Sequence, residues 1–580
     1  MPKNTAVTSE RVDDIPLLIA QMRHMQLDSL LDKHFTPHGN WGGLTPGQLS
    51  VLWLTYILSE GDHRLNQLES WLEDHRLTVG SCLSLQTRRE DASDDHLAHL
   101  LDLLSDDARW ASFEQDCTPT LLRTYALTPR FHRVDSTSAS GYGQVTPEGL
   151  FQFGHSKDHR PDLPQVKIKL TTLDPLGLPI VTQVVPGHHS DDPLYVPAIR
   201  QAQACLPTRG LTHIGDSKMG ALDTRAYIHH SGDYYLMPLG LVQMSAAAID
   251  ARLAPVWRKK QPVASVYSPR DPEGHREKLA VGFEWRETMQ ATVADTPITW
   301  TERRLLVHSL RYAAAQEKSL RARLAETQQA LLALNQRGRG RRRYPELAPL
   351  QTAAEALLEQ HAVTELLQVT YHAQTTERTR RAYGQRPADT TTTTDYHLQV
   401  KVLAQPLAHA IRRLGWRVYA TNQAARELSL AQAVLAYRQQ YLEERGFGRL
   451  KGRALMLAPM YLTSDQRVVG LIRLLSLGLR VLTLVEFEVR RSLQQAKDEL
   501  TGLYAGQPKR ATARPTTEQI LHAFKGITLI VWRSGATQES HLAPLTPVQK
   551  RILKLLKFPA TLYSRLERNS IKLAHKMGEP

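Results

Sequence analysis

The stretch FHRVDST, residues 131–137, is a short strand-like run that leads into an acidic residue, Asp135. Three further β-like runs follow it, with turns between them: LFQF, VKIKLTTL and IVTQVV. The helix-like stretch PLYVPAIRQAQACL then precedes another strand that leads into an acid, LTHIGDS, which contains Asp216. Much later, GWRVYATN indicates a strand, and the helix-like stretch AYRQQYLEERGFGRLKG after it carries Glu444.

Leaving aside the short run LFQF, the order of these elements is three strands, a helix, a strand, an insertion, a strand and a helix. It is the element order of the RNase H-like fold, an α/β fold with a mixed sheet flanked by helices. In that fold the first and fourth strands are parallel neighbours in mid-sheet, so Asp135 and Asp216 should emerge at one edge. Ligand sites of such sheets favour the carboxyl ends of the strands. Three carboxylates gathered there could hold two divalent metals about 3.5–4 Å apart, an arrangement that serves phosphoryl transfer.

The domain organisation follows from changes in pattern along the chain. Apolar residues at helical spacing dominate up to about residue 125, and the region between Asp216 and Glu444 is far longer than one helix requires. It contains β-like runs and a long helix interrupted by RGRGRRRY (337–344), and RPADTTTTTDY (386–396) is expected to be a loop. We therefore expect a helical N-terminal DNA-binding or assembly domain (1–125), the first part of the catalytic core (126–232), an insertion domain with a β part and a helical hairpin (233–395), the second part of the core (396–500) and a mostly helical C-terminal module (515–580).

Composition indicates a folded protein with a polyanionic partner. The chain has 580 residues, 42% of them hydrophobic, with a net charge of +14 and a pI of about 9.6. A protein this basic usually binds a polyanion, although mere solubility is the simpler alternative. The three cysteines lie far apart without a CxxC motif, which argues against a disulfide framework and a zinc ribbon. No GxxxxGK[ST] loop is present, so no use of ATP is expected.

The most apolar stretch, residues 468–489, could be mistaken for a membrane span. Arg473, Arg480, Glu486 and Glu488 interrupt it, and a charge in mid-membrane costs about 2.5–3.5 kcal/mol. We interpret it as a buried helix of a large core and expect no membrane association. The N-terminus lacks the apolar core of a signal peptide, so a cytoplasmic, nucleoid-associated protein is expected.

A group of polar residues around Glu444 has the spacing of one helix face. At roughly 100° per residue, Tyr437, Gln440, Glu444 and Lys451 fall within an arc of about 60°, whereas Glu443 points about 100° away from Glu444. A carboxylate can hold metal, a lysine can bind phosphate, and a tyrosine can bind phosphate or stack on a base. Taken alone, an ordinary amphipathic helix with solvated charges explains this segment better. With Asp135 and Asp216 at strand ends, the catalytic interpretation is favoured.

These residues resemble those of bacterial insertion-sequence transposases of the DDE class with a Y–R–E–K signature. Tyr437, Glu444 and Lys451 match that signature, and Gln440 stands where the family has arginine. The departure puts a phosphate ion pair at 440 in doubt, and Arg438 or Arg445 could compensate for it. The segments VDSTSASGYG, GHSKDHRPDLPQVK, IGDSKMGALDTRAYI and ERGFGRLKGR also look like this family, over residues 5 to about 490.

The resemblance implies a metal-dependent DNA transposase. Asp135, Asp216 and Glu444 would coordinate two Mg²⁺ or Mn²⁺ ions, and the freed 3′-hydroxyl at a cut transposon end would attack target DNA. The partners would be double-stranded transposon ends and target DNA, with a homodimer in the synaptic complex. Two other classes stay open: an RNase H-like nuclease without strand transfer, and a non-catalytic DNA-binding protein.

Further basic residues are candidates for DNA contact. His155, Lys157 and Arg160 could touch DNA near the metals, although a solvated turn is as good an explanation. The arginine run 337–343 includes Arg339, Arg341 and Arg342, for which phosphate contact is favoured over a solvated loop. The polar segment with His188, His189, Asp191 and Asp192 is interpreted as a loop rather than a metal site.

Overall fold

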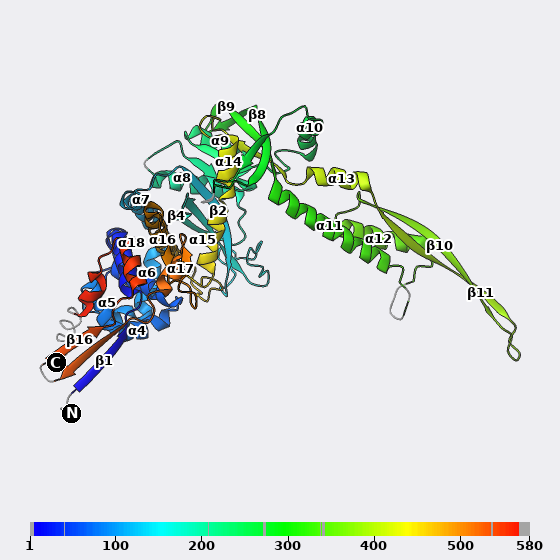
Figure 1. Cartoon of the computed structure of the whole chain (residues 1–580). Coiled ribbons are helices and arrows are strands. Elements are labelled where there is room, and N and C mark those ends of the chain that lie inside the picture. Colours follow the sequence, from blue (N-terminus) through cyan, green and yellow to red (C-terminus); the bar gives the residue numbers. More distant parts are fainter. Residues whose placement is uncertain are drawn as a thin grey trace. The chain divides into compact units, whose positions relative to one another are not determined.

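The chain forms two compact units of mixed α and β structure, whose elements are labelled in Figure 1. The computed structural model describes residues 5–39, 41–206, 208–270, 274–336, 338, 343–534 and 537–567. Unit 1 comprises Met1–Met237, Met289–Trp300 and Ala436–Pro580. Unit 2 comprises Pro238–Thr288 and Thr301–Leu435.

The N-terminal part of unit 1 is helical after one strand. Helix α3 (Pro46–Glu60) illustrates what sets the ends of these helices. At its start the Thr45 side chain accepts from the Gln48 backbone N–H and Pro46 occupies the first turn; at its end Gly61 adopts a left-handed conformation with φ 69°. The elements are β1 (Thr5–Arg11), α1 (Ile15–His24), α2 (Leu27–His34), α3 (Pro46–Glu60), α4 (Leu65–Asp74), α5 (Arg76–Leu83), the 3₁₀ turn η1 (Arg89–Ala92), α6 (Asp94–Leu104) and α7 (Asp107–Thr124).

A mixed sheet follows, with strands in the order β4-β3-β2-β5-β6. β2 pairs antiparallel with β3 and parallel with β5, and β5 pairs parallel with β6. Helix α8 contacts β2, β3 and β4, while α15 contacts β2. The elements are β2 (Phe131–Ser140), β3 (Gln165–Leu173), β4 (Leu178–Pro186), η2 (Asp192–Leu194), α8 (Tyr195–Cys205), β5 (Thr212–Ile214), η3 (Ser217–Gly220), α9 (Leu222–His230), β6 (Tyr234–Pro238) and α15 (Tyr441–Lys451).

The structure corrects one expectation about these strands. Asp135 does not end its strand, because β2 continues to Ser140 by pairing with β3 as far as Ser140↔Gln165. On its other side β5 pairs parallel with β6, a short strand that the sequence did not reveal. The expected strand in 415–422 is present as β12 (Trp416–Thr421), which pairs antiparallel with β9.

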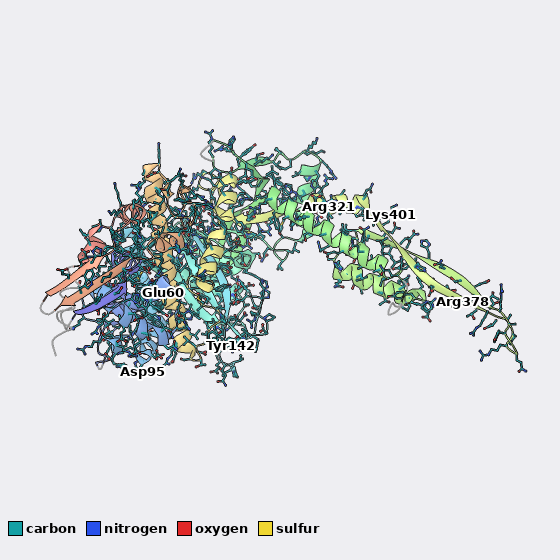
Figure 2. The ribbon with its side chains drawn as sticks, turned by 60° about the horizontal axis from the view of Figure 1, so that its bottom comes forward. Glu60, Asp95, Tyr142, Arg321, Arg378 and Lys401 are labelled. Carbon is teal, nitrogen blue, oxygen red and sulfur yellow. The ribbon has the colours of Figure 1, made fainter. Side chains whose placement is uncertain are left out.

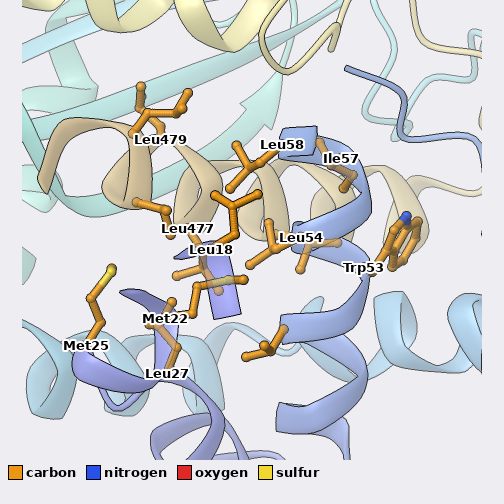
Figure 3. Packing of buried hydrophobic residues seen from close by; sticks show 14 of the residues in the cluster. Leu18, Met22, Met25, Leu27, Trp53, Leu54, Ile57, Leu58, Leu477 and Leu479 are labelled. Atoms are coloured by element: carbon orange, nitrogen blue, oxygen red, sulfur yellow. The ribbon is translucent and has the colours of Figure 1, made fainter. Parts of the chain in front are cut away.

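The core of unit 1 is centred on one long helix, α16 (Asp465–Ala496). It contacts α1, α3 and α6, and Figure 3 shows Leu18 of α1, Leu54 of α3 and Leu477 of α16 in this core. The approach of α6 is close at Gly470, where an added Cβ would lie 2.1 Å from the Leu101 carbonyl oxygen. Each such leucine contributes about 1.5–3 kcal/mol by leaving water.

The charges inside α16 are paired, which allows them to be buried. Arg480 donates to Glu114 of α7 at 2.8 Å with both side chains fully buried, and Arg473 donates to the Leu104 carbonyl at 2.9 Å. By length and composition α16 could cross a membrane, but 94% of its most apolar window is buried inside the protein. This agrees with the prediction of a buried core helix.

The C-terminal part of unit 1 contains more strand than expected. The N-terminal β1 pairs antiparallel with β15, and β15 pairs with β16, so the two ends of the chain share a sheet. Helix α18 begins with a cap, in which the Thr546 side chain accepts from the Gln549 N–H, and Pro547 occupies the first turn. The elements are β13 (Leu500–Thr501), β14 (Ala511–Thr512), α17 (Thr517–His522), β15 (Thr528–Ser534), β16 (Thr537–Leu542) and α18 (Pro547–Leu555).

Unit 2 combines a sheet segment, in the order β12-β9-β8-β7, with a helical and ribbon part. In the latter, α11, α12 and the β10–β11 pair share a core that includes Leu324, Leu350 and Leu398. The elements are α10 (Ala246–Trp257), β7 (Ala264–Tyr267), β8 (Lys278–Val293), β9 (Thr296–Ser309), α11 (Leu310–Ala333), α12 (Leu347–Gln360), β10 (Leu367–Arg380), β11 (Asp389–Val402), α13 (Ala404–Arg413), β12 and α14 (Leu430–Arg438); β8 and β9 each extend into the segment assigned to unit 1.

The expected loop over 386–396 is wrong for most of its length. Residues from Asp389 onward form β11, paired with β10 from Arg380↔Asp389 to Leu367↔Val402. Five consecutive threonines suit a strand because β-branched side chains favour the extended backbone. The expected domain boundary between residues 395 and 396 falls inside β11, and unit 2 continues to Leu435.

Candidate active site

Asp135 and Asp216 lie at matching positions relative to two paired parallel strands. The ladder between β2 and β5 runs from Phe131↔Thr212 to Arg133↔Ile214. Each aspartate lies two residues beyond that last pair, Asp135 within β2 and Asp216 just after the end of β5. Burial and the negative charge of Asp216 both raise the pKa of Asp135. The topology therefore brings together two acids that are 81 positions apart in the chain.

Asp216 is held by the turn that follows β5. It caps the 3₁₀ turn η3, where its Oδ1 accepts from the Lys218 backbone N–H at 2.8 Å. The same oxygen accepts from the Tyr195 hydroxyl at 2.7 Å. Tyr195 begins α8, so the turn after β5 and the helix before it orient this carboxylate together.

Asp135 lies in a confined environment with both acidic and basic neighbours. Burial raises the pKa of its carboxyl, and the neighbouring charges of Asp216 and Asp191 raise it further. Lys157 opposes this rise, with its Nζ 3.9 Å from Asp135 Oδ1. The Ser136 backbone N–H also donates to this oxygen at 2.7 Å.

Lysines surround the two aspartates. Lys157 donates to the Ser136 carbonyl, and Lys167 donates to Asp191 Oδ1 at 3.0 Å. Lys169 is 1% exposed, and its Nζ lies 3.5 Å from the centre of the Tyr195 ring with no hydrogen-bond partner among the described residues. Burial lowers the pKa of Lys169 to about 8, although the nearby aspartates oppose the shift. Much of the local negative charge is thus balanced by ammonium groups.

The segment around Glu444 is two helices rather than one. α14 ends at Arg438 and α15 begins at Tyr441, with Gln440 as the N-cap. Tyr437 therefore does not share a continuous helix with Glu444 and Lys451, and the single-face argument is wrong for it. It holds between Glu444 and Lys451, seven residues apart on α15.

Lys451 binds the strand that carries Asp135. Its Nζ donates to Thr137 Oγ1 at 2.8 Å and to the Ser138 carbonyl at 3.4 Å, and it pairs with Asp158 at 2.5 Å.

Two adjacent glutamates of α15 differ in environment. Glu443 is buried, with 4% of its surface exposed, and its Oε1 has no hydrogen-bond partner in the described part of the chain. Burial raises the pKa of Glu443 well above its usual range, and the charges of Asp135 and Asp216 add to this rise. Glu444 is exposed. The buried acid that interacts with the two aspartates is thus Glu443, and the role of Glu444 as third carboxylate stays a prediction.

The other residues predicted around the signature occupy varied positions. Arg445 pairs with Glu486 of α16, which also binds Arg449 at 2.6 Å, so its guanidinium already has a structural partner. Tyr437, Arg438 and Gln440 are half-buried. Their predicted contacts with DNA stay predictions.

The basic residues after β2 differ in what they contact. Lys157 contacts β2, as described above, and His155 is exposed. Arg160 is exposed too and forms a bidentate pair with Asp162, with N–O distances of 2.9 and 2.7 Å. Arg339, Arg341 and Arg342 lie outside the described residues.

Several residues of the site were not identified from the sequence, namely Tyr195, Lys169, Asp191 and Glu443. The alternation in VKIKLTTL places Lys169 on the polar phase of the strand, with Lys167 and Thr171, so the sequence pattern gave no indication that Lys169 is buried. Asp191 lies in the segment interpreted as a polar loop, yet its Oδ1 accepts from Ser136 Oγ at 2.7 Å. The angular spacing in the sequence favoured Glu444 over Glu443, and it gave no indication that Glu443 is the buried one of the two.

The donor set suits a hard divalent cation, although it is not assembled as a ligand cage. Across the described ranges, no three His, Cys, Asp or Glu side chains are arranged to hold a metal ion. Yet the carboxylates raise one another's pKa beside the unpartnered Oε1 of Glu443, and a bound divalent cation would compensate these charges. Oxygen ligands of this kind fit Mg²⁺ or Mn²⁺.

Comparison with known proteins gives little help. No family model matches the sequence, and no curated protein matches it. Among solved structures, a piggyBac transposase in a synaptic complex with hairpin DNA aligns over 96% of this chain and 85% of that chain, with 9% sequence identity and a TM-score of 0.33. A likeness this weak assigns neither a family nor an activity to this chain.

Proposed function

We propose that the chain is a DNA transposase with an RNase H-like core, of the kind that insertion sequences encode. The observation that carries the proposal is the position of Asp135 and Asp216, each two residues beyond the last pair of a parallel ladder. The sheet order, with the first and fourth core strands adjacent and parallel, supports the RNase H-like core. The basic composition supports a polyanionic substrate.

In this proposal Asp135, Asp216 and Glu444 hold two Mg²⁺ or Mn²⁺ ions, and Glu443 is the alternative to Glu444. The ions would supply a nucleophile at neutral pH and stabilise the leaving oxygen. The burial of Glu443 and its interaction with Asp135 and Asp216 favour this alternative. The exposure of Glu444 and its shared face with Lys451 favour the original assignment.

The reaction needs no covalent bond to the protein. Water attacks a phosphodiester at the transposon end, the P–O3′ bond breaks, and a free 3′-hydroxyl results. That hydroxyl then attacks a phosphorus of target DNA and displaces the target 3′-oxygen. The carboxylates orient the reacting groups, and Lys451 and Lys157 are placed along β2 to bind phosphate oxygens once DNA competes for them.

Transposition joins two ends in one complex, so we propose a homodimer on paired ends. The end sequences are best sought in the DNA that flanks the coding sequence, as short inverted repeats. Cross-linking that detects only monomers on paired ends would argue against the dimer.

The test uses a plasmid that carries the flanking DNA on both sides of a marker, incubated with the full-length protein and Mg²⁺ or Mn²⁺. Cleavage at the ends and joining to a second plasmid support the proposal. Cleavage without joining would indicate a nuclease, and binding alone would indicate a non-catalytic DNA-binding protein.

The matched control is Asp135→Ala. This variant should bind the flanking DNA as the wild type does and should not cut it. Cleavage at the wild-type rate by Asp135→Ala would refute the metal assignment.

A further inference from the structure

The β10–β11 pair in unit 2 is a long two-stranded ribbon whose outer half lacks a core. Both strands have 14 residues, which at about 3.3 Å per residue is about 45 Å. Leu367 and Leu398 near the base are buried against α11 and α12. Every residue from His372 to Thr393 is exposed, and we call this segment the distal arm.

The base of the ribbon is firmly attached within unit 2. The Asn335 side chain bonds both the carbonyl and the N–H of Leu398, at 2.7 and 2.9 Å, and Asp395 pairs with Arg343. The Tyr396 N–H donates to the Tyr344 carbonyl at 2.8 Å. The distal arm extends beyond α11 and α12 from this attachment, as Figure 1 shows. An isolated two-stranded hairpin is only marginally stable in water, so an arm of this length suits a partner that covers it.

The side chains of the distal arm do not suit a protein partner. Tyr383, 87% exposed, is its only large apolar or aromatic side chain. Protein interfaces usually bury an apolar or aromatic centre that is poor in charge. Instead, four arginines lie between residues 378 and 386 with no acid among them: Arg378, Arg380, Arg381 and Arg386. Charge and exposed threonine hydroxyls together match a phosphate backbone.

The register places these groups for contact with a duplex. Arg378 lies opposite Thr391 and Arg380 opposite Asp389, so the two arginines project from the same face of the ribbon. The end of the ribbon is closed by a bridge between Tyr383 and Arg386, with Gly384 at φ 61°. Figure 2 shows Arg378 in the distal arm and Lys401 near the base. A two-stranded ribbon of this kind fits the major groove of B-DNA.

We propose that the distal arm, His372–Thr393, binds double-stranded DNA and that its four arginines contact phosphates. The inference rests on the proposed function for the identity of the polyanion as DNA. It goes beyond that function by assigning DNA contact to a segment that lies outside the candidate active site.

The test compares two full-length variants with the same loss of charge. The first replaces the four arm arginines: R378A/R380A/R381A/R386A. The control removes four exposed cations elsewhere in unit 2: R258A/K260A/R311A/K318A. Binding of a labelled 30-base-pair duplex is measured by fluorescence anisotropy at several salt concentrations, and circular dichroism checks that each variant is folded.

The arm variant should weaken binding on the order of tenfold or more at about 0.1 M salt, and should reduce the slope of log K against log salt by up to about 3 to 4. The control variant should change both much less. Equal effects of the two variants on affinity and slope would overturn the proposal.

A third variant replaces the residues between Gln374 and Asp395 by an Asn-Gly turn. Gln374 and Asp395 lie opposite each other in the ribbon, so this change removes most of the distal arm. It should lose duplex affinity as the arginine variant does. If it alters the oligomeric state in sedimentation but leaves duplex affinity unchanged, the arm serves contact between copies and the proposal is overturned.

The outcomes separate the two proposals. If the wild type binds duplex through the distal arm but never cuts DNA, the proposed transposase function is overturned and the DNA-binding role of the arm stands. If the wild type cuts and joins DNA and the arm variants bind and act as it does, only the DNA-binding role of the arm is overturned.

Discussion

Two hydroxyl-rich strands of this protein have opposite environments. In β2, Ser136, Thr137, Ser138 and Ser140 are all buried, whereas Thr390 to Thr393 of β11 are all exposed. β2 lies between β3 and β5, while β11 pairs with β10 alone. Burial of a polar strand is therefore decided by its neighbouring strands and covering helices rather than by its own composition.

The hydroxyls do different things in the two strands. In β2 they hold the candidate site together: Ser136 Oγ donates to Asp191, Thr137 Oγ1 accepts from Lys451 and Ser138 Oγ accepts from the Lys157 N–H. In β11 the Thr390 hydroxyl donates to the hydroxyl of Thr379 at 3.3 Å and the Thr393 hydroxyl donates to the Thr376 carbonyl at 3.4 Å, both across the ribbon. The hydroxyls of β2 thus contact residues outside its own sheet partners, whereas these two β11 hydroxyls contact only β10.

The largest contrast is expected from the same change of acid to amide in each strand. Asp135→Asn in β2 should lower cleavage of the flanking DNA by at least about 10³-fold, because one oxygen ligand for the metals is lost. Asp389→Asn in β11 should leave cleavage within about twofold and slightly strengthen DNA binding, since it removes a negative charge opposite Arg380. Plasmid cleavage and anisotropy measure both. Similar losses of cleavage in the two variants would contradict the distinction.

The next contrast lies within α15. If Glu444 is the third carboxylate, Glu444→Gln should lower cleavage by at least about 100-fold and Glu443→Gln should not, and the reverse should hold if Glu443 takes that role. Binding of Mn²⁺, followed by electron paramagnetic resonance, should weaken in the same variant that loses cleavage. Because an amide in place of the buried Glu443 carries no charge to desolvate, Glu443→Gln should not lower the melting temperature of the metal-free protein. Unchanged Mn²⁺ binding in both variants would exclude both glutamates.

A smaller effect should appear in the pH dependence of stability. Asp233 lies in the turn before β6. Burial alone would raise the pKa of its carboxyl, but hydrogen bonds from His213 and Gln203 outweigh burial and lower that pKa to about 2. The ordinary value is 3.8, so this carboxylate stabilises the fold fully above about pH 4, and the contribution is lost as the pH falls toward 2.

At about 1.4 kcal/mol per pKa unit, the contribution is on the order of 2 kcal/mol. Denaturant unfolding of wild type and Asp233→Asn at several pH values measures it. The difference between them should shrink as the pH drops below about 4, whereas Asp389→Asn in the ribbon should show no such trend. A difference that is constant between pH 7 and pH 3 would count against the assignment.

The smallest contrast concerns the hydroxyls themselves. Ser138→Ala should lower the free energy of unfolding by about 1 kcal/mol, since the Lys157 N–H would lose its acceptor at 2.8 Å. Thr391→Ala, on the exposed ribbon, should change it by less than about 0.5 kcal/mol. Equal losses would show that the ribbon hydroxyls are not free to meet a ligand.

The part of the fold predictable from the sequence was the part set by local pattern. The runs around FHRVDST, VKIKLTTL and LTHIGDS alternate or end in turn residues, and each lies in a strand of the structure or leads out of one. The charges within 468–489 indicated a buried helix because each charge requires a partner, and α7 and α15 supply partners.

The rest depends on information that no local window contains. β6 is a five-residue strand, too short for periodicity to be measured. The break between α14 and α15 falls at Gln439 and Gln440, residues with no strong helix-breaking tendency. Because the helix is not continuous over 437–451, angular spacing measured from Tyr437 could not decide which of the two glutamates is buried.

The last pair of the β2–β5 ladder, Arg133↔Ile214, has a consequence for changes in this region. Each acid follows that pair by the same number of residues, with Val134 or Gly215 between. Deletion of either intervening residue would move a carboxylate to the opposite face of the sheet or away from the other acid. A substitution at Val134 keeps this spacing, whereas a side chain at Gly215 would also meet Met219, whose Sδ lies 2.8 Å from the position of an added Cβ.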